Sequence, residues 1–234
     1  MKTFIVKNSG KVGKLASKIV LDELKTKKDL VIGFATGETP LGLYNEMINS
    51  SEDFSNVTTF NLDEYYPIES ENVQSYSYFM HKNLFDKLKF GEVNLLNGSA
   101  KDANLECLRY EELIDSKKID IQILGIGSNG HIGFNEPGSK LDSKTRMVQL
   151  SDNTIKDNSR LFESPKDVPK QALTMGISTI LKSKKIILLA TGKNKSSAVN
   201  EMINGPVDSC CPASFLQKHE DVIVIVDKEA AKDL

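Results

Sequence analysis

The chain has 234 residues, 39% of them hydrophobic, which is enough to bury the core of one medium-sized domain. Its 30 basic and 32 acidic residues give a net charge of -2, and the lysines are scattered along the sequence. Duplex nucleic acid is therefore not an expected partner. No apolar run approaches the length of a membrane span, so we expect no membrane association.

The amino-terminal segment and the cysteines predict a cytoplasmic protein. The start MKTFIVKNSG turns polar after a few apolar residues and lacks the apolar stretch of a signal peptide. Cys107, Cys210 and Cys211 are an odd number without the spacing of metal ligands. Reduced thiols in the cytoplasm are the simplest interpretation, and no metal site is predicted.

Short apolar runs rich in β-branched residues alternate with segments of helical period. The predicted strands are Thr3 to Val6, Leu30 to Ala35, Thr58 to Leu62, Ile119 to Gly125, Lys185 to Ala190 and Val222 to Val226. One predicted helix surrounds Val12 to Val20, and others are Leu41 to Ile48, Ser75 to Leu88, Leu105 to Ser116, Gln171 to Leu181 and Lys195 to Ile203. This alternation predicts a Rossmann-like α/β fold, an open, mostly parallel, twisted sheet with helices on both faces.

We interpret residues 1–234 as a single domain without a linker. The stretch from Gly138 to Pro169 is less regular and more polar than its surroundings. It is interpreted either as a lid that folds over a site or as ordinary surface loops with one helix.

The first segment with a chemical signature runs from Val31 to Tyr44, where an apolar strand leads into a glycine-containing turn and a helix. Thr39 is a favourable N-cap and Pro40 a favourable first helical residue. Free N–H groups at such a turn favour an anion, and the hydroxyls of Thr36 and Thr39 add donors. The segment predicts a phosphate site, although similar junctions occur in α/β proteins that bind nothing there.

The second segment is Thr59 to Tyr65, in which Asp63 and Glu64 directly follow an apolar strand. Ligands of open parallel sheets lie at the carboxyl ends of the strands, so one of these carboxylates is expected to point into a cleft and act as a base. An isolated pair of acids also fits a helix cap or a loop in solvent.

The third segment, Ile121 to Gly138, is the most specific. An apolar strand ends in a glycine-rich turn that contains Asn129 and His131, with Glu136 soon after. Histidine exchanges protons near neutral pH, and a neighbouring carboxylate can fix its tautomer and stabilise its cation. This placement favours catalysis by His131, whereas the other two histidines of the chain fit structural roles.

Two basic residues could reach a phosphate: Arg160, and Lys195 just after another predicted strand. Arginine grips phosphate with two parallel hydrogen bonds, and lysine supplies a point charge. Each, taken alone, also fits a solvated surface charge.

Together these segments resemble the glucosamine-6-phosphate deaminase family in order and spacing over almost the whole chain. The matching stretches are Ala35 to Tyr44, Asn61 to Tyr65, Gln74 to Tyr76, Tyr78 to Met80, Gly125 to Gly138, Asn158 to Arg160, Val168 to Gly176 and Gly192 to Lys195. The related 6-phosphogluconolactonases share the fold and the glycine-rich turn, but a Ser-Leu-Phe-Pro pattern follows their histidine. In this chain the sequence Ile-Gly-Phe-Asn-Glu-Pro, from Ile132 to Pro137, follows His131, and this difference favours the deaminase over the lactonase.

The resemblance implies conversion of glucosamine 6-phosphate and water into fructose 6-phosphate and ammonia, with no metal or organic cofactor. His131 would move a proton at the ring oxygen during ring opening, oriented by Asn129 and Glu136. Asp63 would remove the C2 proton to give an enolamine, and reprotonation at C1 would give an imine that water hydrolyses.

The resemblance also implies which residues hold the substrate: Thr36, Gly37, Glu38, Thr39, Gly130, Arg160 and Lys195. Their binding energy would hold the 6-phosphate and so position C1 and C2. The chain departs from the family pattern at three places, one of which is Tyr66-Pro67, where small or apolar residues are more common after the Asp-Glu-Tyr motif. Asn129 stands where many members have Asp. Glu38 stands where a small hydroxyl residue or glycine is usual, so its negative charge has to point away from the phosphate or the phosphate has to bind in a different place.

The chain is similar to the shorter branch of the family, which lacks the C-terminal extension of the hexameric, allosterically regulated enzymes, so we expect a monomer. Two other functions stay open: a lactonase, which would hydrolyse 6-phosphogluconolactone, and a non-catalytic sensor that binds the sugar phosphate without turnover.

Overall fold

The computed structural model describes residues 1–151, 154–155 and 168–234. Within these residues a seven-stranded sheet has the order β1-β10-β9-β6-β2-β3-β5, and each neighbouring pair is parallel. The strands are β1 (Lys2–Val6), β2 (Val31–Phe34), β3 (Thr58–Asn61), β5 (Glu92–Asn94), β6 (Ile121–Leu124), β9 (Lys185–Ala190) and β10 (Val222–Asp227). All six predicted strands are present, and the predicted fold class is confirmed.

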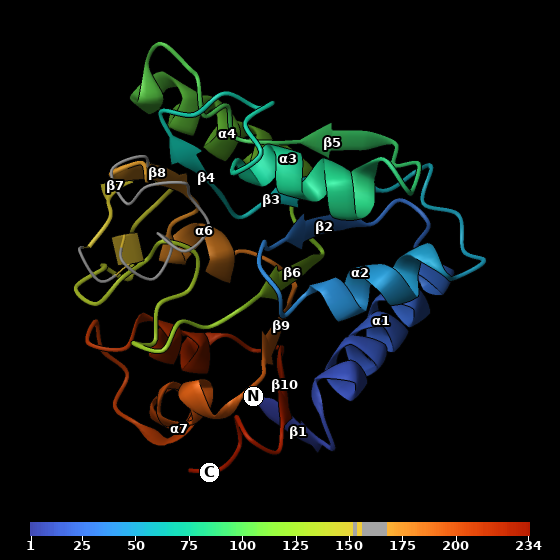
Figure 1. The fold of residues 1–234 in the computed structure, drawn as a ribbon, viewed down its shortest axis with the longest axis vertical. Helices are drawn as coiled ribbons and strands as arrows, with labels where there is room; N and C mark the ends of the chain where they lie inside the picture. The colour runs from blue at the N-terminus through green and yellow to red at the C-terminus, as the bar shows by residue number, and fades with distance from the viewer. Residues whose placement is uncertain (152–153, 156–167) are drawn as a thin grey trace.

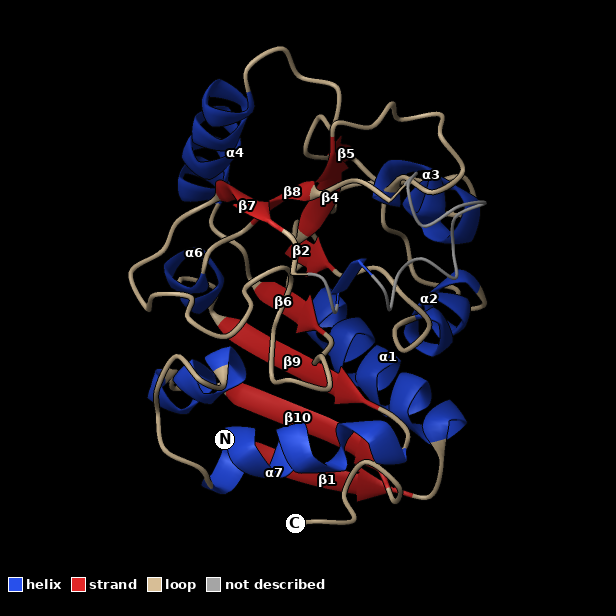
Figure 2. Ribbon diagram, turned by 60° about the vertical axis from the view of Figure 1, so that its left-hand side comes forward, coloured by secondary structure: helices blue, strands red, loops and turns tan. Residues whose placement is uncertain are grey.

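Helices cover both faces of this sheet, and Figures 1 and 2 show the two layers. One layer holds α1 (Ser9–Thr26), α2 (Leu41–Ile48) and α3 (Tyr76–Met80), which continues as the π-helical turn η1 (His81–Phe85). The other holds α4 (Ala103–Lys117), α6 (Ile177–Leu181), α7 (Ser196–Asn204) and the 3-10 helix η5 (Pro212–Lys218). A short 3-10 turn, η4 (Lys193–Lys195), precedes α7.

Alternation along each strand divides the core between the two layers. In β2, Ile32 and Phe34 join the cluster under α1 and α2, while Val31 and the following Ala35 join the cluster under α4 and α7. A strand buried on both faces needs apolar residues on both. This explains why the strands of the parallel sheet were visible as continuous apolar runs.

A second, antiparallel sheet has the order β4-β8-β7, with β4 (Asp63–Tyr66), β8 (Gln171–Thr174) and β7 (Arg146–Gln149). Leu62 joins the two sheets. Its N–H donates to the carbonyl of Phe34 at 2.9 Å, and its carbonyl accepts from the N–H of Met175 at 2.9 Å. The strand that begins at Asp63 is thereby held across the end of the parallel sheet.

Two local predictions are wrong. The predicted helix from Gln171 to Leu181 is a strand over Gln171–Thr174 and a helix only over Ile177–Leu181, because pairing with β4 and β7 outweighs the helix propensity of its residues. Helix α2 begins at Leu41 with Pro40 as its N-cap and no side-chain cap hydrogen bond, so Thr39 is not the cap. Thr39 instead lines the cavity described below.

Candidate active site

A cavity of about 620 Å³ opens at the carboxyl ends of β2, β3, β6 and β9. From β2 the chain continues outward through β3 to β5, whereas from β6 it runs the other way through β9 to β10. Open α/β sheets bind ligands at this kind of reversal point. The described lining residues come from the segments after these strands: 35–40, 62–63, 125–128, 131, 191 and 194–195, with Tyr76, Gly133, Phe134 and Thr154 completing the wall.

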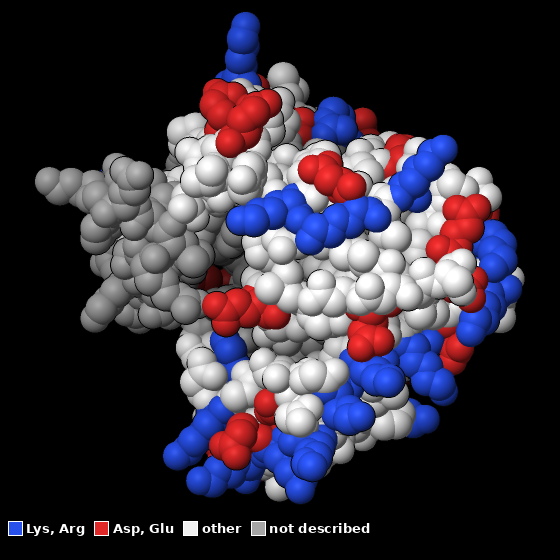
Figure 3. Space-filling view, turned by 45° about the vertical axis from the view of Figure 1, so that its right-hand side comes forward, with Lys and Arg blue, Asp and Glu red and all other residues white. Residues whose placement is uncertain are grey.

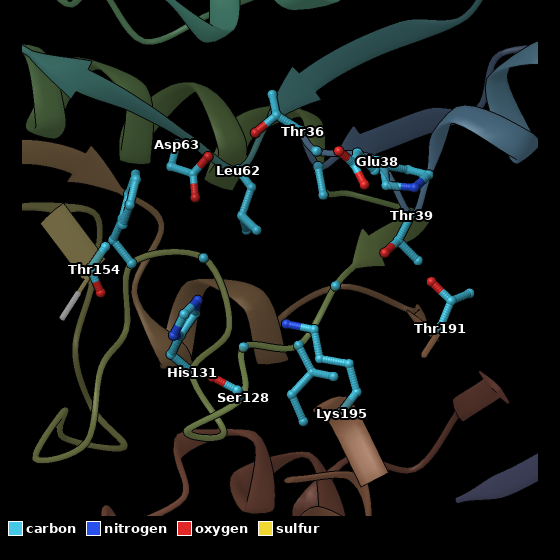
Figure 4. A pocket seen from close by; sticks show the side chains of 18 of the residues that line it. Thr36, Glu38, Thr39, Leu62, Asp63, Ser128, His131, Thr154, Thr191 and Lys195 are labelled. Atoms are coloured by element: carbon cyan, nitrogen blue, oxygen red, sulfur yellow. The ribbon is translucent and has the colours of Figure 1, made fainter. Parts of the chain in front are cut away.

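Asp63 is buried, with 6% of its surface exposed, and its carboxylate lines the cavity. Burial raises its pKa to about 8, and the charge of the adjacent Glu64 adds to the shift. Figure 4 shows Asp63 on the same side of the cavity as His131. A carboxylate with a raised pKa is a stronger base than an aspartate in water, as abstraction of a carbon-bound proton requires.

The loop after β6 carries His131 into the same cavity. Its turn is closed by hydrogen bonds from the Gly127 N–H to the His131 carbonyl (2.9 Å) and from the Gly130 N–H to the Gly127 carbonyl (3.0 Å). A Cβ atom at Gly127 would lie 2.2 Å from His131 Nδ1, so only glycine lets the imidazole pack on this backbone. Gly130 has a φ of 81°, which also favours glycine.

Asn129 is hydrogen-bonded to His131. Its Oδ1 lies 2.6 Å from His131 Nδ1 and accepts the His131 backbone N–H at 3.2 Å. An amide oxygen only accepts, so this bond places a proton on Nδ1 and leaves Nε2 with its lone pair in the neutral ring. Asn129 thus fixes the tautomer without a negative charge.

Glu136 accepts from Thr154 Oγ1 at 2.5 Å and from the Ser151 N–H at 3.5 Å. It lines a neighbouring cavity of about 480 Å³, and Phe134 lines both cavities. The carboxylate therefore connects the loop of His131 to the segment at Ser151, which lies within the stretch interpreted as a lid.

Across the cavity from His131, Figure 4 shows Glu38 and Thr39 of the segment after β2, with Lys195, after β9, between His131 and Thr39. Thr36 and Gly37 also line the cavity, and Lys195 is the only lysine or arginine among the described lining residues. Gly130 and Asn129 are not among the described lining residues, and Arg160 lies outside the described residues.

Sequence reasoning missed Thr191, Asn194 and Ser128 as lining residues. Thr191 directly follows β9, and Figure 4 shows it beside Thr39. The rule that led to Asp63, a polar residue just after an apolar strand, would also have found Thr191.

On the face drawn in Figure 3, basic and acidic side chains are interspersed over the described residues.

None of the described helices is long and apolar enough to cross a membrane. The described residues contain no group of three or more His, Cys, Asp or Glu side chains that could hold a metal ion.

A carboxylate and a histidine that share one cavity with hydroxyl-bearing turns and a lysine, at the carboxyl ends of parallel strands, are the features of an α/β enzyme active site. The chain matches the family of glucosamine-6-phosphate isomerases and 6-phosphogluconolactonases over residues 9–225. It belongs to this family, so the resemblance seen in the sequence is confirmed.

Curated relatives are alike over nearly their whole length. A glucosamine-6-phosphate deaminase of Streptococcus agalactiae is 51% identical over 234 residues, covering 100% of both chains. One of Lacticaseibacillus paracasei is 54% identical over 222 residues, covering 94% of each.

Solved structures agree with this family membership. One described as a monomeric glucosamine-6-phosphate deaminase has a TM-score of 0.97 at 44% identity, covering 100% of both chains. A 6-phosphogluconolactonase from Trypanosoma brucei has a TM-score of 0.80 at 17% identity, covering 100% of this chain and 98% of its own, and shares the fold alone.

Proposed function

We propose that this chain is a glucosamine-6-phosphate deaminase, which converts glucosamine 6-phosphate and water into fructose 6-phosphate and ammonia. The observation that carries the proposal is the placement of Asp63 and His131 in one cavity with the turn at 36–39 and Lys195. Full-length identity of about half to curated deaminases supports the same reaction.

Ring opening is the step we assign to His131. The Nδ1 proton is held by Asn129, so we assign to Nε2 the transfer of the proton from the C1 hydroxyl to the ring oxygen. Breaking the C1–O5 bond gives the open-chain aldehyde. We assign Glu136 a supporting role through the loop that it shares with His131 and through its bond to Thr154.

Asp63 then removes the C2 proton, which the adjacent C1 carbonyl makes acidic. The electron pair of the broken C–H bond forms the C1–C2 double bond of an enolamine, while the π pair of the C1 carbonyl moves to its oxygen, which takes up a proton. A proton returned to C1 then leaves the nitrogen at C2 as a protonated imine. Water adds to this imine, and ammonia leaves. A base with a pKa of about 8 is well matched to this work.

We place the 6-phosphate at Thr36, Gly37, Thr39 and Lys195, with Arg160 as a further proposed ligand. N–H and hydroxyl donors at such a turn suit an anion. Held there, the phosphate would fix the orientation of C1 and C2 at the other side of the cavity.

The deciding experiment measures ammonia and fructose 6-phosphate released from glucosamine 6-phosphate. The Asp63→Asn variant is expected to lose turnover and also exchange of the C2 proton with deuterated water. Wild-type turnover by this variant would exclude Asp63 as the base. Hydrolysis of 6-phosphogluconolactone without ammonia release would instead indicate a lactonase, and calorimetric binding without turnover a sensor.

We further propose that the enzyme works in the cytoplasm as a monomer. The similar structure described as monomeric supports the oligomeric state. Three free cysteines, two of them buried, suit a reducing compartment. Sedimentation of the purified chain tests whether it is a monomer.

A further inference from the structure

Glu64 is a buried carboxylate that the proposed mechanism does not use. It follows Asp63 on β4 and has 3% of its surface exposed. Successive side chains of a strand point to opposite faces. Asp63 faces the cavity, and Glu64 contacts the start of α3 on the other side.

Three backbone N–H groups converge on the Glu64 carboxylate. Oε1 accepts from the N–H of Tyr65 at 2.9 Å and of Tyr76 at 2.8 Å, and Oε2 accepts from the N–H of Ser77 at 2.7 Å. The first N–H groups of a helix have no acceptor within the helix. Glu64 satisfies the first two of α3 and so fastens this helix to the strand that carries Asp63.

The fastened residue Tyr76 forms part of the cavity wall. Its ring stacks on Phe134, with centroids 5.9 Å apart and planes 4° apart, and it packs against Tyr65 at 4.8 Å. Phe134 lies three residues after His131 in the same loop. The contacts therefore run from Glu64 through Tyr76 to the loop of the proposed ring-opening residue.

The second effect of Glu64 is electrostatic. Burial raises its pKa to about 7, against the opposing effect of its three N–H donors, and its negative charge adds to the raised pKa of Asp63. Within the part of the chain that the structure describes, the other titratable groups near Asp63 are the phenols of Tyr44 on α2, Tyr65 on β4, Tyr76 on α3 and Tyr110 on α4. His131, Lys195 and Glu38 line the same cavity. Burial raises the pKa of each of these phenols, so they stay neutral while Asp63 titrates.

We propose that Glu64 is a positioning residue of the deaminase reaction: its carboxylate holds Tyr76 against the His131 loop from the strand position next to Asp63. The proposal rests on the proposed function only for the identity of the reaction. The effect on Asp63 belongs to the protein without substrate and is measurable there.

The central test is Glu64→Gln, which keeps the size and one acceptor oxygen but removes the charge. Without the neighbouring charge, the acid limb of the kcat/KM profile should move to lower pH, and kcat should fall by roughly tenfold because the weaker base is a poorer catalyst. Carbon-13 NMR titration of aspartate carboxyls, with Asp63 assigned through Asp63→Asn, should show the same downward movement without substrate. An unmoved Asp63 titration would overturn the electrostatic part.

Two further variants separate charge from hydrogen bonding. Glu64→Asp keeps the charge but is too short to reach the N–H groups of both Tyr76 and Ser77, so the acid limb should stay near its wild-type pH while kcat falls. Wild-type kcat in this variant would overturn the positioning part. Ser75→Ala removes the other cap of α3, in which the Tyr78 N–H donates to the Ser75 hydroxyl at 2.9 Å. This variant should leave the Asp63 titration unmoved. A shift of the Asp63 titration equal to that in Glu64→Gln would show that loosening of the helix causes it and would overturn the proposal.

Glu106→Gln is the matched control for loss of a buried carboxylate. Glu106 is 8% exposed, accepts the Asn97 N–H at 2.8 Å and pairs with Arg109, and it does not line the cavity. Its replacement should lower the melting temperature and leave the acid limb in place. If Glu64→Gln moves the NMR titration of Asp63 while wild-type protein releases no ammonia, the proposed reaction is wrong and the Glu64–Asp63 coupling stands.

Discussion

Asn129 Oδ1 accepts two hydrogen bonds from one residue, the backbone N–H and the ring Nδ1–H of His131. A neutral amide here orients the imidazole but adds no charge to stabilise the imidazolium. Asn129 therefore contributes to the geometry of the site without contributing a negative charge.

Removing this amide should impair ring opening. In Asn129→Ala both tautomers of His131 become accessible, so kcat/KM should fall by about tenfold to a hundredfold, within the range of general acid-base catalysis. In Asn129→Asp the bond is kept and the added charge favours the imidazolium, so activity should persist with its acid limb at higher pH. Steady-state kinetics from pH 5 to 9 measure both, and wild-type kcat/KM in Asn129→Ala would contradict the role of the amide.

Gly127→Ala should displace the His131 ring, because its Cβ would meet Nδ1 at 2.2 Å. We expect kcat to fall by about a hundredfold, as small displacements of catalytic groups do, with a modest change in melting temperature. Gly10→Ala is the comparison outside the cavity, since a Cβ there would meet only Asn8 Oδ1, at an ordinary contact distance of 3.6 Å. Equal losses in the two variants would argue against a steric effect on His131.

Asp63→Asn should stabilise the fold in a pH-dependent way. The pKa of Asp63 is raised to about 8 in the folded chain, so between about pH 4 and 8 the folded state binds more protons than the unfolded state, and stability falls as pH rises. Asparagine does not titrate. The melting temperature of the variant minus that of the wild type should therefore be larger at pH 8 than at pH 5, and a constant difference would show that Asp63 titrates normally.

Thr154→Val should weaken the link between Glu136 and the segment at Ser151. Valine keeps the shape of threonine and removes the donor to Glu136 Oε1, so we expect kcat/KM to fall by roughly tenfold. Thr179→Val is the control, because Thr179 donates to the buried Glu111 at 2.7 Å and does not line the cavity. It should lower the melting temperature and spare catalysis, and the reverse pattern would contradict the role of Thr154.

The parallel sheet was predictable because strands buried on both faces need mostly apolar residues, as in Lys185–Ala190, where residues 186–190 are all apolar and buried. The antiparallel sheet was not. Asp63–Tyr66 begins with two acids, which are rare in strands, and the residues of Gln171–Thr174 suit a helix. Both segments are strands because they pair with each other, and Gln171–Thr174 pairs on its other side with Arg146–Gln149.

In the candidate site, too, some residues could be predicted from local sequence patterns and others could not. Asp63 and His131 were found because each follows an apolar strand. The bond between Glu136 and Thr154 joins residues 18 positions apart, and no local pattern indicates it. The lid within residues 138–169 stays a prediction, since 152–153 and 156–167 lie outside the described residues.

The passage of the chain through Leu62 from one sheet to the other has a consequence for how this scaffold can change its chemistry. The turns proposed to grip phosphate extend from the parallel sheet, whereas Asp63 stands on the antiparallel one. Directed evolution toward another phosphorylated sugar can therefore vary β4 and its contacts with α3 while the proposed phosphate-binding turns stay unchanged. Libraries built on Asp63, Tyr76 and Phe134 would sample new reactions, and libraries built on Thr39, Thr191 and Asn194 would sample new anchoring groups.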